Sequence, residues 1–338
     1  SILKTYRNRY REKKDREGKC RGMNIVLLDA KTLGEDIGYE VLEPFGAVKA
    51  YPQTTPETEE ARIAEADVLI VNKYRIWERN LSCVPHLKLI CVAATGYDNI
   101  DLQACRRHGV AVCNVVGYST GCVAQLTIGM ALSLVNHLPE YTEHVRSGEY
   151  TRQGSANCLF PAYHEISGMT WGIVGFGNIG TAVGKVAQAL GCRVLVHKRT
   201  PVEGWNCTDL ETVCRESDIL SLHVPLNEQT RKMLDRKHIA MLRKNAIVIN
   251  VARGAVTDEE ALAEAVEENR IGGLGADVYS TEPIGTDHPF WRIRNRPNVC
   301  LTPHMAWGGY ETRIRLLSEI ARNIEAFRNG TRRCRVDS

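Results

Sequence analysis

The sequence predicts an α/β protein built on two doubly wound parallel sheets, and three observations support this prediction. The 338 residues are enough for two domains of about 150 residues each. Short, nearly continuous apolar segments alternate with amphipathic ones, which is typical of parallel strands covered by helices on both faces. The composition, 43% hydrophobic and 25% charged, is that of a globular protein and excludes intrinsic disorder, collagen and coiled coil.

The first strand–helix series begins at Met23. Its predicted strands are apolar runs bounded by polar or turn residues, over 25–28, 68–71, 87–92 and 110–113. Amphipathic helices are predicted between them over 57–66 and 102–108. A long apolar helix is expected over 123–137. The polar stretch 140–168 has few periodic signals, so we expect it to be irregular.

The second series begins at Thr170. Strands are predicted over 171–174, 194–196, 219–223, 246–250, 274–278 and 299–301. A helix over 181–190 follows the first of them, and an amphipathic helix over about 310–327 closes the chain. We therefore expect a substrate-binding domain of residues 23–120 and 305–338, with a nucleotide-binding domain of residues 121–304 inserted into it.

Charge divides the chain unevenly. Residues 1–22 hold nine Lys/Arg and three Asp/Glu, whereas the remainder holds 34 basic and 37 acidic residues. This basic N-terminal extension could touch nucleic acid or anionic lipid, or it could be an upstream segment without a partner. The rest of the chain has no excess of basic charge, so no nucleic-acid partner is expected.

Apolar runs and cysteines indicate the compartment. No apolar stretch approaches the ~20 residues that span a bilayer, and the basic N-terminus lacks the apolar region of a signal peptide. The twelve cysteines are scattered, without a CxxC pair. We therefore expect reduced thiols in a cytoplasmic protein, with neither a membrane partner nor a metal site.

A glycine motif, G-x-G-x-x-G, follows the first strand of the second series and opens a helix. Gly175 would permit the tight turn, Gly177 would let the backbone approach a pyrophosphate, and Gly180 would let the helix pack on the strand. Asn178 and Ile179 complete the first helical turn, whose N–H groups can bind phosphate. A glycine-rich turn can be purely structural, but in this strand–turn–helix context it predicts dinucleotide binding.

The next strand bears on the choice of dinucleotide. NAD enzymes place an acidic residue on the ribose 2′-hydroxyl about twenty residues after the motif. Here the strand ends at Val196-His197-Lys198-Arg199, without an acid. Two positive charges favour a 2′-phosphate, so we expect NADP(H), with NAD(H) possible; the alternative is an exposed basic turn that touches nothing.

Five further segments carry recognisable motifs. They are Ala94-Thr95-Gly96-Tyr97-Asp98-Asn99-Ile100-Asp101, His223-Val-Pro225-Leu-Asn-Glu-Gln-Thr230, Ile249-Asn-Val-Ala-Arg253-Gly, Gly275-Ala-Asp277-Val-Tyr-Ser-Thr-Glu282-Pro283 and Leu301-Thr-Pro-His304-Met-Ala-Trp307. Together with the glycine motif, they resemble the D-isomer-specific 2-hydroxyacid dehydrogenase family, from Met23 to about Phe327. Ala93-Ala94-Thr95-Gly96 and Gly117-Tyr-Ser-Thr120 are most similar to its glycerate dehydrogenase (hydroxypyruvate or glyoxylate reductase) branch. The resemblance implies a Rossmann NAD(P)-binding domain inserted into a flavodoxin-like substrate domain.

The resemblance also implies a catalytic trio. Arg253 would bind the substrate carboxylate and polarise its carbonyl, His304 would donate the proton, and Glu282 would pair with the histidine. The chemistry agrees, because arginine's planar fork suits a carboxylate and an imidazole titrates near neutral pH. Taken alone, an arginine after a strand is often a surface ion pair, and a histidine is often a surface polar residue.

Other implied contacts surround this trio. Thr95 and Gly96 would offer backbone N–H groups to the substrate, and Trp307 could wall its pocket or be a core aromatic. Asp277 would hydrogen-bond the nicotinamide amide, while Pro225 and Thr230 would line the adenosine side. The remaining expected cofactor contacts are His223, Val251 and Ala252.

The resulting prediction is an oxidoreductase that reduces a small 2-oxo acid, such as hydroxypyruvate or glyoxylate, with NAD(P)H to the (R)-2-hydroxy acid. A formate dehydrogenase-like enzyme is disfavoured, because that branch has glutamine at the position of Glu282. A nucleotide-sensing corepressor-like scaffold is the other alternative. The segment 140–168 resembles the family's dimer arm, so we expect a homodimer.

Overall fold

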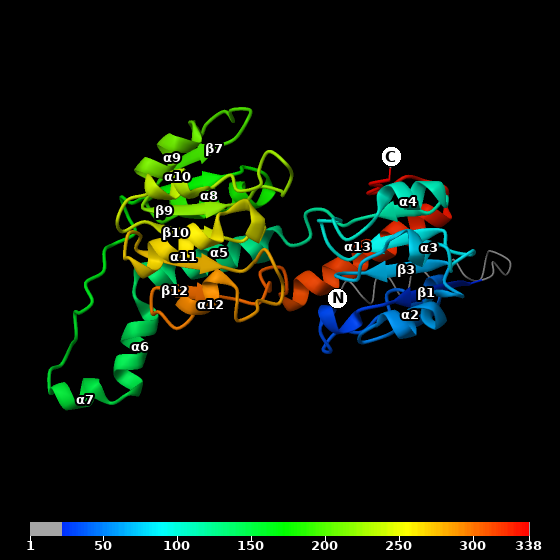
Figure 1. Cartoon of the computed structure of the whole chain (residues 1–338), viewed down its shortest axis with the longest axis horizontal. Helices are drawn as coiled ribbons and strands as arrows, with labels where there is room; N and C mark the ends of the chain where they lie inside the picture. Colours follow the sequence, from blue (N-terminus) through cyan, green and yellow to red (C-terminus); the bar gives the residue numbers. More distant parts are fainter. Residues whose placement is uncertain (1–21, 338) are drawn as a thin grey trace. The chain divides into compact units, whose positions relative to one another are not determined.

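The computed structural model describes residues 22–337, and they divide into two compact units. One unit contains the residues up to Ser119 and those from Gly308 onward, and the other is Thr120–Trp307 (Figure 1). The boundaries expected from sequence are about 120 and 305, and the roles of the two units stay a prediction. The basic extension over residues 1–22 lies, except for Gly22, outside the described residues.

The first unit is built on a five-stranded parallel sheet in the order β2-β1-β3-β4-β5. Both β3 and β4 are buried along their whole length, which is why they read as apolar runs. The strands are β1 Met23–Leu27, β2 Gly46–Ala50, β3 Val68–Val71, β4 Leu89–Val92 and β5 Ala111–Cys113. The α-helices are α2 Pro56–Ile63, α3 Glu78–Leu81, α4 Leu102–Arg107 and α13 Tyr310–Arg328, with 3-10 turns η1 Ala30–Leu33 and η2 Glu43–Phe45.

The second unit is built on a seven-stranded parallel sheet in the order β12-β11-β10-β9-β6-β7-β8. Chain order reverses between β6 and β9, and ligands bind at such a switch point, at the carboxyl ends of the strands. The strands are β6 Thr170–Val174, β7 Arg193–His197, β8 Asn206–Cys207, β9 Ile219–Leu222, β10 Ile247–Asn250, β11 Gly273–Ala276 and β12 Val299–Leu301. The α-helices are α5 Thr120–Val135, α6 Leu138–Arg146, α7 Glu149–Gln153, α8 Asn178–Ala189, α9 Leu210–Glu216, α10 Arg236–Ala240, α11 Glu259–Glu267 and α12 Pro289–Ile293, with η3 Gly254–Val256.

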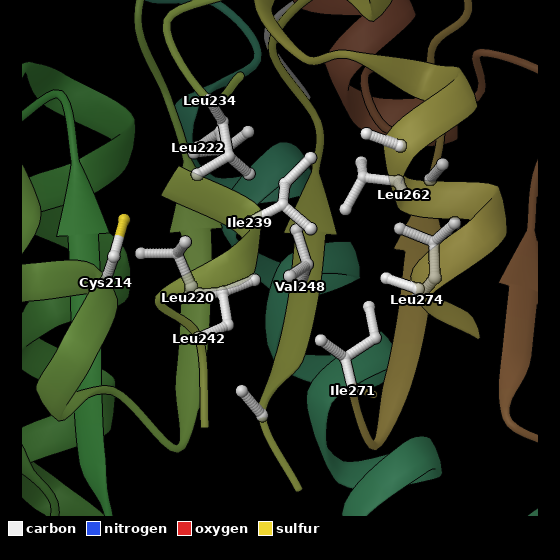
Figure 2. Packing of buried hydrophobic residues seen from close by; sticks show 14 of the residues in the cluster. Cys214, Leu220, Leu222, Leu234, Ile239, Leu242, Val248, Leu262, Ile271 and Leu274 are labelled. Carbon is white, nitrogen blue, oxygen red and sulfur yellow. The ribbon is translucent and has the colours of Figure 1, made fainter. Parts of the chain in front are cut away.

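Alternate residues of the central strands enter two different cores. Leu220, Leu222 and Val248 pack with Ile239 of α10 and other residues on one face, as Figure 2 shows. Ile219, Ile247 and Ile249 pack with residues of α5 and α8 on the other face. Because both faces are covered, every residue of a central strand must be apolar or small, and this produces the continuous apolar runs in the sequence.

Three sequence expectations are corrected. The stretch expected to be irregular over 140–168 contains α7 and most of α6, two short helices that bury no residue. The strands β2 and β8 were not expected; both lie at sheet edges and are partly exposed, so they have no apolar run. Helix α8 begins at Asn178 rather than at residue 181, because the glycine motif itself forms its first turn.

Two negative findings apply to residues 22–337. No single helix there is long and apolar enough to cross a membrane; the pair α5–α6, bent by 62°, passes only by length and composition. The cysteines of this part are free thiols, and its His, Cys, Asp and Glu side chains form no group of three suited to a metal ion.

Candidate active site

The glycine turn lies at the switch point of the second sheet. Gly175 adopts a φ of +91°, a left-handed conformation that side chains disfavour, and its N–H donates to the His197 carbonyl at 2.9 Å. A Cβ at Gly175 would lie 2.8 Å from the His223 carbonyl oxygen. The turn is therefore held between the ends of β7 and β9, where only glycine fits.

The first turn of α8 has the features of a phosphate site. Gly177 is its N-cap, without a side chain to cap the helix, and the space where its Cβ would project is open. A Cβ at Gly180 would lie 2.2 Å from the Gly175 carbonyl oxygen, so the helix packs directly on the turn. The first N–H groups of an α-helix have no intrahelical partner, and exposed Asn178 and partly exposed Ile179 carry two of them.

His223, which follows β9 next to the glycine turn, belongs to a series of hydrogen-bonded side chains. The Trp171 indole N–H donates to Ser221 Oγ at 3.0 Å, and Ser221 Oγ lies 3.0 Å from His223 Nε2. Burial lowers the pKa of His223 to about 3, so the ring is neutral. Its Nδ1 is buried and has no hydrogen-bond partner within residues 22–337. A buried polar atom without a partner is costly unless a ligand satisfies it, so His223 fits a cofactor edge.

The basic pair lies beside the glycine turn. Lys198 and Arg199 are exposed and directly follow His197, whose carbonyl binds the turn. The Arg199 guanidinium lies 3.5 Å from the Gln229 side-chain oxygen, in the loop after β9. In that loop, buried Thr230 uses its hydroxyl internally, donating to the carbonyl of exposed Pro225 at 2.6 Å. Thr230 thus shapes the loop around Pro225.

The residues around the glycine turn fit a dinucleotide. They combine open helix N–H groups, a backbone cradle that a Cβ would fill, and the orphaned nitrogen of His223. Each of these features is suited to oxygen atoms of phosphate or ribose groups.

Arg253 lies in a turn after β10 that is stabilised by side-chain hydrogen bonds. The buried side chain of Asn250 accepts from the Ala252 N–H and donates to the Arg253 carbonyl, both at 3.0 Å. Val251 and Ala252 are buried, whereas Arg253 is partly exposed. The Arg253 guanidinium group donates to the Ala252 carbonyl at 2.8 Å.

Glu282 and His304 form a direct pair. His304 Nδ1 lies 2.7 Å from Glu282 Oε2, with side chains that are 18% and 30% exposed. His304 has a φ of +52°, a conformation that costs a non-glycine residue of the order of 1–3 kcal/mol. The imidazole is therefore held in one place by its surroundings.

Asp277 provides much of that support. Its carboxylate accepts hydrogen bonds from the Thr302 hydroxyl at 2.6 Å and from the N–H groups of Met305 and Ala306 at 2.8 and 2.9 Å. The side chain is fully buried, and burial raises its pKa. These bonds connect Asp277 to residues on both sides of His304, so Asp277 anchors the His304 loop. The expected contact of Asp277 with the nicotinamide amide stays a prediction.

The sheet brings these loops to one edge. The Asp277 N–H donates to the Asn250 carbonyl at 3.0 Å, and the Thr302 N–H donates to the Ala276 carbonyl at 2.9 Å. The ends of β10, β11 and β12 are thus adjacent, and they carry Arg253, Glu282 and His304 in their following loops. Trp307 packs against the apolar cluster that includes α5, which agrees with the core alternative.

In the first unit, the Thr95–Gly96 turn follows β4. The Thr95 hydroxyl donates to the Val115 carbonyl at 2.8 Å, and the Asn114 amide donates to the Thr95 carbonyl at 2.7 Å. These bonds fix the turn through the Thr95 side chain and the Thr95 carbonyl, and they do not use the backbone N–H groups of Thr95 and Gly96. The substrate contacts of Thr95 and Gly96 stay a prediction.

Comparison with known proteins decides the family. Residues 128–306, just over half of the chain, match the model of the D-isomer specific 2-hydroxyacid dehydrogenase NAD binding domain. The chain belongs to this family. A glycerate dehydrogenase of Methylorubrum extorquens is 36% identical, covering 90% of this chain and 95% of its own. A hydroxypyruvate reductase of Blautia hydrogenotrophica is 32% identical, covering 91% and 98%.

Solved structures agree with the sequence relatives of this dehydrogenase. An acyclic imino acid reductase in complex with NADPH and D-Arg has a TM-score of 0.80 at 27% identity, covering 93% of this chain and 100% of its own. A D-lactate dehydrogenase of Aquifex aeolicus, in complex with NAD and lactic acid, has a TM-score of 0.79 at 29% identity, covering 91% and 96%. The family and the α/β fold expected from the sequence are confirmed.

Several supporting residues of the dehydrogenase were missed at the level of sequence. Asn250 and Ser221 lie inside strands and read as ordinary strand positions. Asp29 accepts from the N–H groups of Asn72, Lys73 and Tyr74, and so holds the loop after β3. In the sequence, each of these residues is only a polar residue within or next to an apolar run, and this pattern does not predict which group the residue will hydrogen-bond.

Proposed function

We propose that this dehydrogenase reduces hydroxypyruvate or glyoxylate to the corresponding D-2-hydroxy acid. The Glu282–His304 pair carries the proposal, because it places a carboxylate-supported imidazole at the edge that also bears the Arg253 turn and the glycine turn. The relatives named glycerate dehydrogenase and hydroxypyruvate reductase support the small substrate.

Three side chains would divide the work. The Arg253 guanidinium would bind the substrate carboxylate and polarise the neighbouring carbonyl. His304 would give its proton to the carbonyl oxygen, and Glu282 would stabilise the protonated ring and fix its orientation. A bound nicotinamide cofactor in its reduced form would supply the hydride for the carbonyl carbon. One hydride and one proton are thus added, and the product is the 2-hydroxy acid.

For the cofactor we propose a preference for NADP(H). Lys198 and Arg199 follow the strand that hydrogen-bonds the glycine turn, and both are exposed. Two cations there would bind a 2′-phosphate by charge-assisted hydrogen bonds. Asn178, Ile179 and the neighbouring glycines would bind the pyrophosphate, and His223 would satisfy its orphaned nitrogen on the cofactor.

A homodimer is also proposed, through the segment that contains α6 and α7. This segment exposes large apolar side chains, including Leu159 at 75% and Phe160 at 83%. Clustered apolar exposure of this kind marks protein–protein contact surfaces. The occupant that we propose is a second copy of the chain, as its resemblance to the family's dimer arm suggests.

The test is a panel of 2-oxo acids assayed by the loss of reduced-cofactor absorbance, with NADH and NADPH in parallel. We expect the highest kcat/KM with hydroxypyruvate or glyoxylate and with NADPH. Turnover confined to bulky branched 2-oxo acids contradicts the substrate assignment, and a higher kcat/KM with NADH contradicts the cofactor assignment.

A further inference from the structure

A buried acid–imidazole pair lies outside the residues assigned above. Glu259, the first residue of α11, and His288, the N-cap of α12, approach to 3.1 Å between Oε2 and Nε2. Their side chains are only 7% and 4% exposed. A buried ionisable pair is seldom retained for stability alone, because desolvation offsets much of its attraction.

The hydrogen bonds of the pair determine its protonation pattern. His288 Nδ1 accepts from the Phe290 N–H at 3.1 Å, so the ring proton must be on Nε2, which donates to Glu259. The other carboxylate oxygen of Glu259 accepts from the Ser280 N–H at 2.9 Å. Glu259 therefore acts as a carboxylate with a donor on each oxygen.

The two residues held in this way, Tyr279 and Ser280, contact Glu282 directly and also contact the segments that carry Arg253 and His304. A Cβ at Gly254 would lie 2.0 Å from the Tyr279 carbonyl carbon, so the turn that carries Arg253 packs directly on this peptide. The Tyr279 N–H donates to Glu282 Oε1 at 3.0 Å. The Tyr279 hydroxyl donates to the Thr302 carbonyl at 2.8 Å, two residues before His304.

We propose that Glu259 and His288 are positioning residues of the reductase: they hold the Ser280 N–H, and thereby the neighbouring Tyr279, whose own N–H orients Glu282 toward His304. The inference rests on the proposed roles of Glu282 and His304. Neither Glu259 nor His288 is placed on the substrate. Displacing a catalytic group by about 1 Å can reduce turnover about a hundredfold, so this support is expected to affect kcat.

The first test is Glu259→Gln. The Ser280 N–H and His288 Nε2 bond different oxygens of Glu259, and glutamine replaces one of these oxygens by an NH2 group, so one of the two donors then faces another donor. We expect kcat to fall about tenfold to a hundredfold, with a much smaller change in KM for the cofactor. The pH above which reduction declines should also fall, because Glu282 would support the protonated ring less well. Glu282 bonds that ring, and Asp277 also acts on it electrostatically.

Glu260→Gln is the matched control. Glu260 is the next residue of α11 and also links α11 to α12, through Arg292 at 2.6 Å, but both side chains are about half exposed. We expect its kcat and pH profile to remain those of the unmodified enzyme. Equal profiles for Glu259→Gln and Glu260→Gln overturn the inference. The pH of the decline does not depend on how much protein is active, so partial unfolding does not obscure it.

Two substitutions of His288 separate positioning from helix capping. Asparagine can still accept from the Phe290 N–H but is too short to reach Glu259, whereas glutamine can reach Glu259 but caps poorly. We expect His288→Asn to reproduce the loss of kcat and His288→Gln to keep most of the turnover. The reverse order overturns the inference. Glu282→Gln, measured in parallel, tests the proposed function itself. Full activity of Glu282→Gln would contradict the proposed catalytic trio. Loss of activity in Glu282→Gln together with normal activity in Glu259→Gln would contradict only the positioning role of Glu259 and His288.

Discussion

The Glu282 carboxylate and the His304 imidazole lie 2.7 Å apart, although they belong to loops that follow different strands of the second sheet. The histidine backbone is in the left-handed region, and its loop is anchored by three hydrogen bonds to the buried carboxylate of Asp277. Such a constrained imidazole is suited to deliver a proton in one direction.

His304→Asn is expected to lower kcat by about 10²- to 10⁴-fold, because asparagine cannot donate an ionisable proton. Cofactor affinity, measured by fluorescence titration, should change little. His238→Asn is the control, since His238 also lies 2.7 Å from a carboxylate, that of Asp235, but on α10 away from the site. Unchanged turnover in His304→Asn would refute the proton-donor role.

Glu282→Gln is expected to change the pH dependence of reduction. A carboxylate beside an imidazole favours the protonated ring, which is the form that donates. Removing the charge should therefore move the decline in kcat/KM to lower pH and lower kcat at neutral pH. Asp235→Asn, which alters the unrelated pair, should leave the profile in place. An identical profile in both variants counts against the pairing.

Lys198→Asp should reverse the choice of cofactor. The substitution removes a cation for the 2′-phosphate and adds a carboxylate that can accept from a ribose hydroxyl. We expect the ratio of kcat/KM for NADPH to that for NADH to fall about tenfold to a hundredfold. Lys244→Asp is the control. It makes the same charge change near the amino end of β10, whereas the glycine turn lies at the carboxyl ends of the strands, so the ratio should remain unchanged.

Replacing Leu159 and Phe160 by serine should weaken the proposed dimer. Both side chains are largely exposed, so their loss should cost the folded chain little stability. Light scattering at micromolar concentration is expected to give a dimer for the unmodified chain and a lower mass for the variant. A monomer in both would reject the dimer.

His223 should make the dehydrogenase less stable in acid. Its pKa is about 3 in the folded chain and about 6.5 when unfolded, so between these values the unfolded state binds more protons. The free energy of unfolding should therefore rise with pH across this window, by at most about 1.4 kcal/mol per pH unit for one proton. In His223→Asn, urea unfolding at pH 4, 5 and 6 should show a correspondingly smaller slope. Equal slopes would mean that the ring is not held neutral.

Much of the fold could be read from local patterns. The strand β3 has the predicted bounds and β6 differs from its prediction by one residue, because residues buried on both faces leave continuous apolar runs. The strand β12 also has the predicted bounds, although it is a partly buried edge strand. The edge strands β2 and β8 escaped prediction, because a partly exposed strand has little apolar patterning. The helices α6 and α7 escaped it because they are short, nine and five residues, within a mostly polar stretch.

Part of the candidate site could likewise be predicted from local patterns in the sequence. The glycine turn was predictable because the G-x-G-x-x-G spacing stands between an apolar strand and a helix, a pattern that is local and visible in the chain. The contact of Gly175 with His223, by contrast, is long-range and appears only in the structure. Motif resemblance also named Arg253, Glu282 and His304.

The amino-acid sequence by itself determined the dehydrogenase family and the two parallel sheets, and it named the residues for which the catalytic roles are proposed. Only the tertiary structure decided how those residues are supported: Asp277 bonds the backbone beside His304, and Glu259 with His288 holds Ser280 beside Glu282. The physical reason is that a buried polar group must find a partner, and that partner is chosen by which strand ends and loops the sheet brings together, not by spacing along the chain.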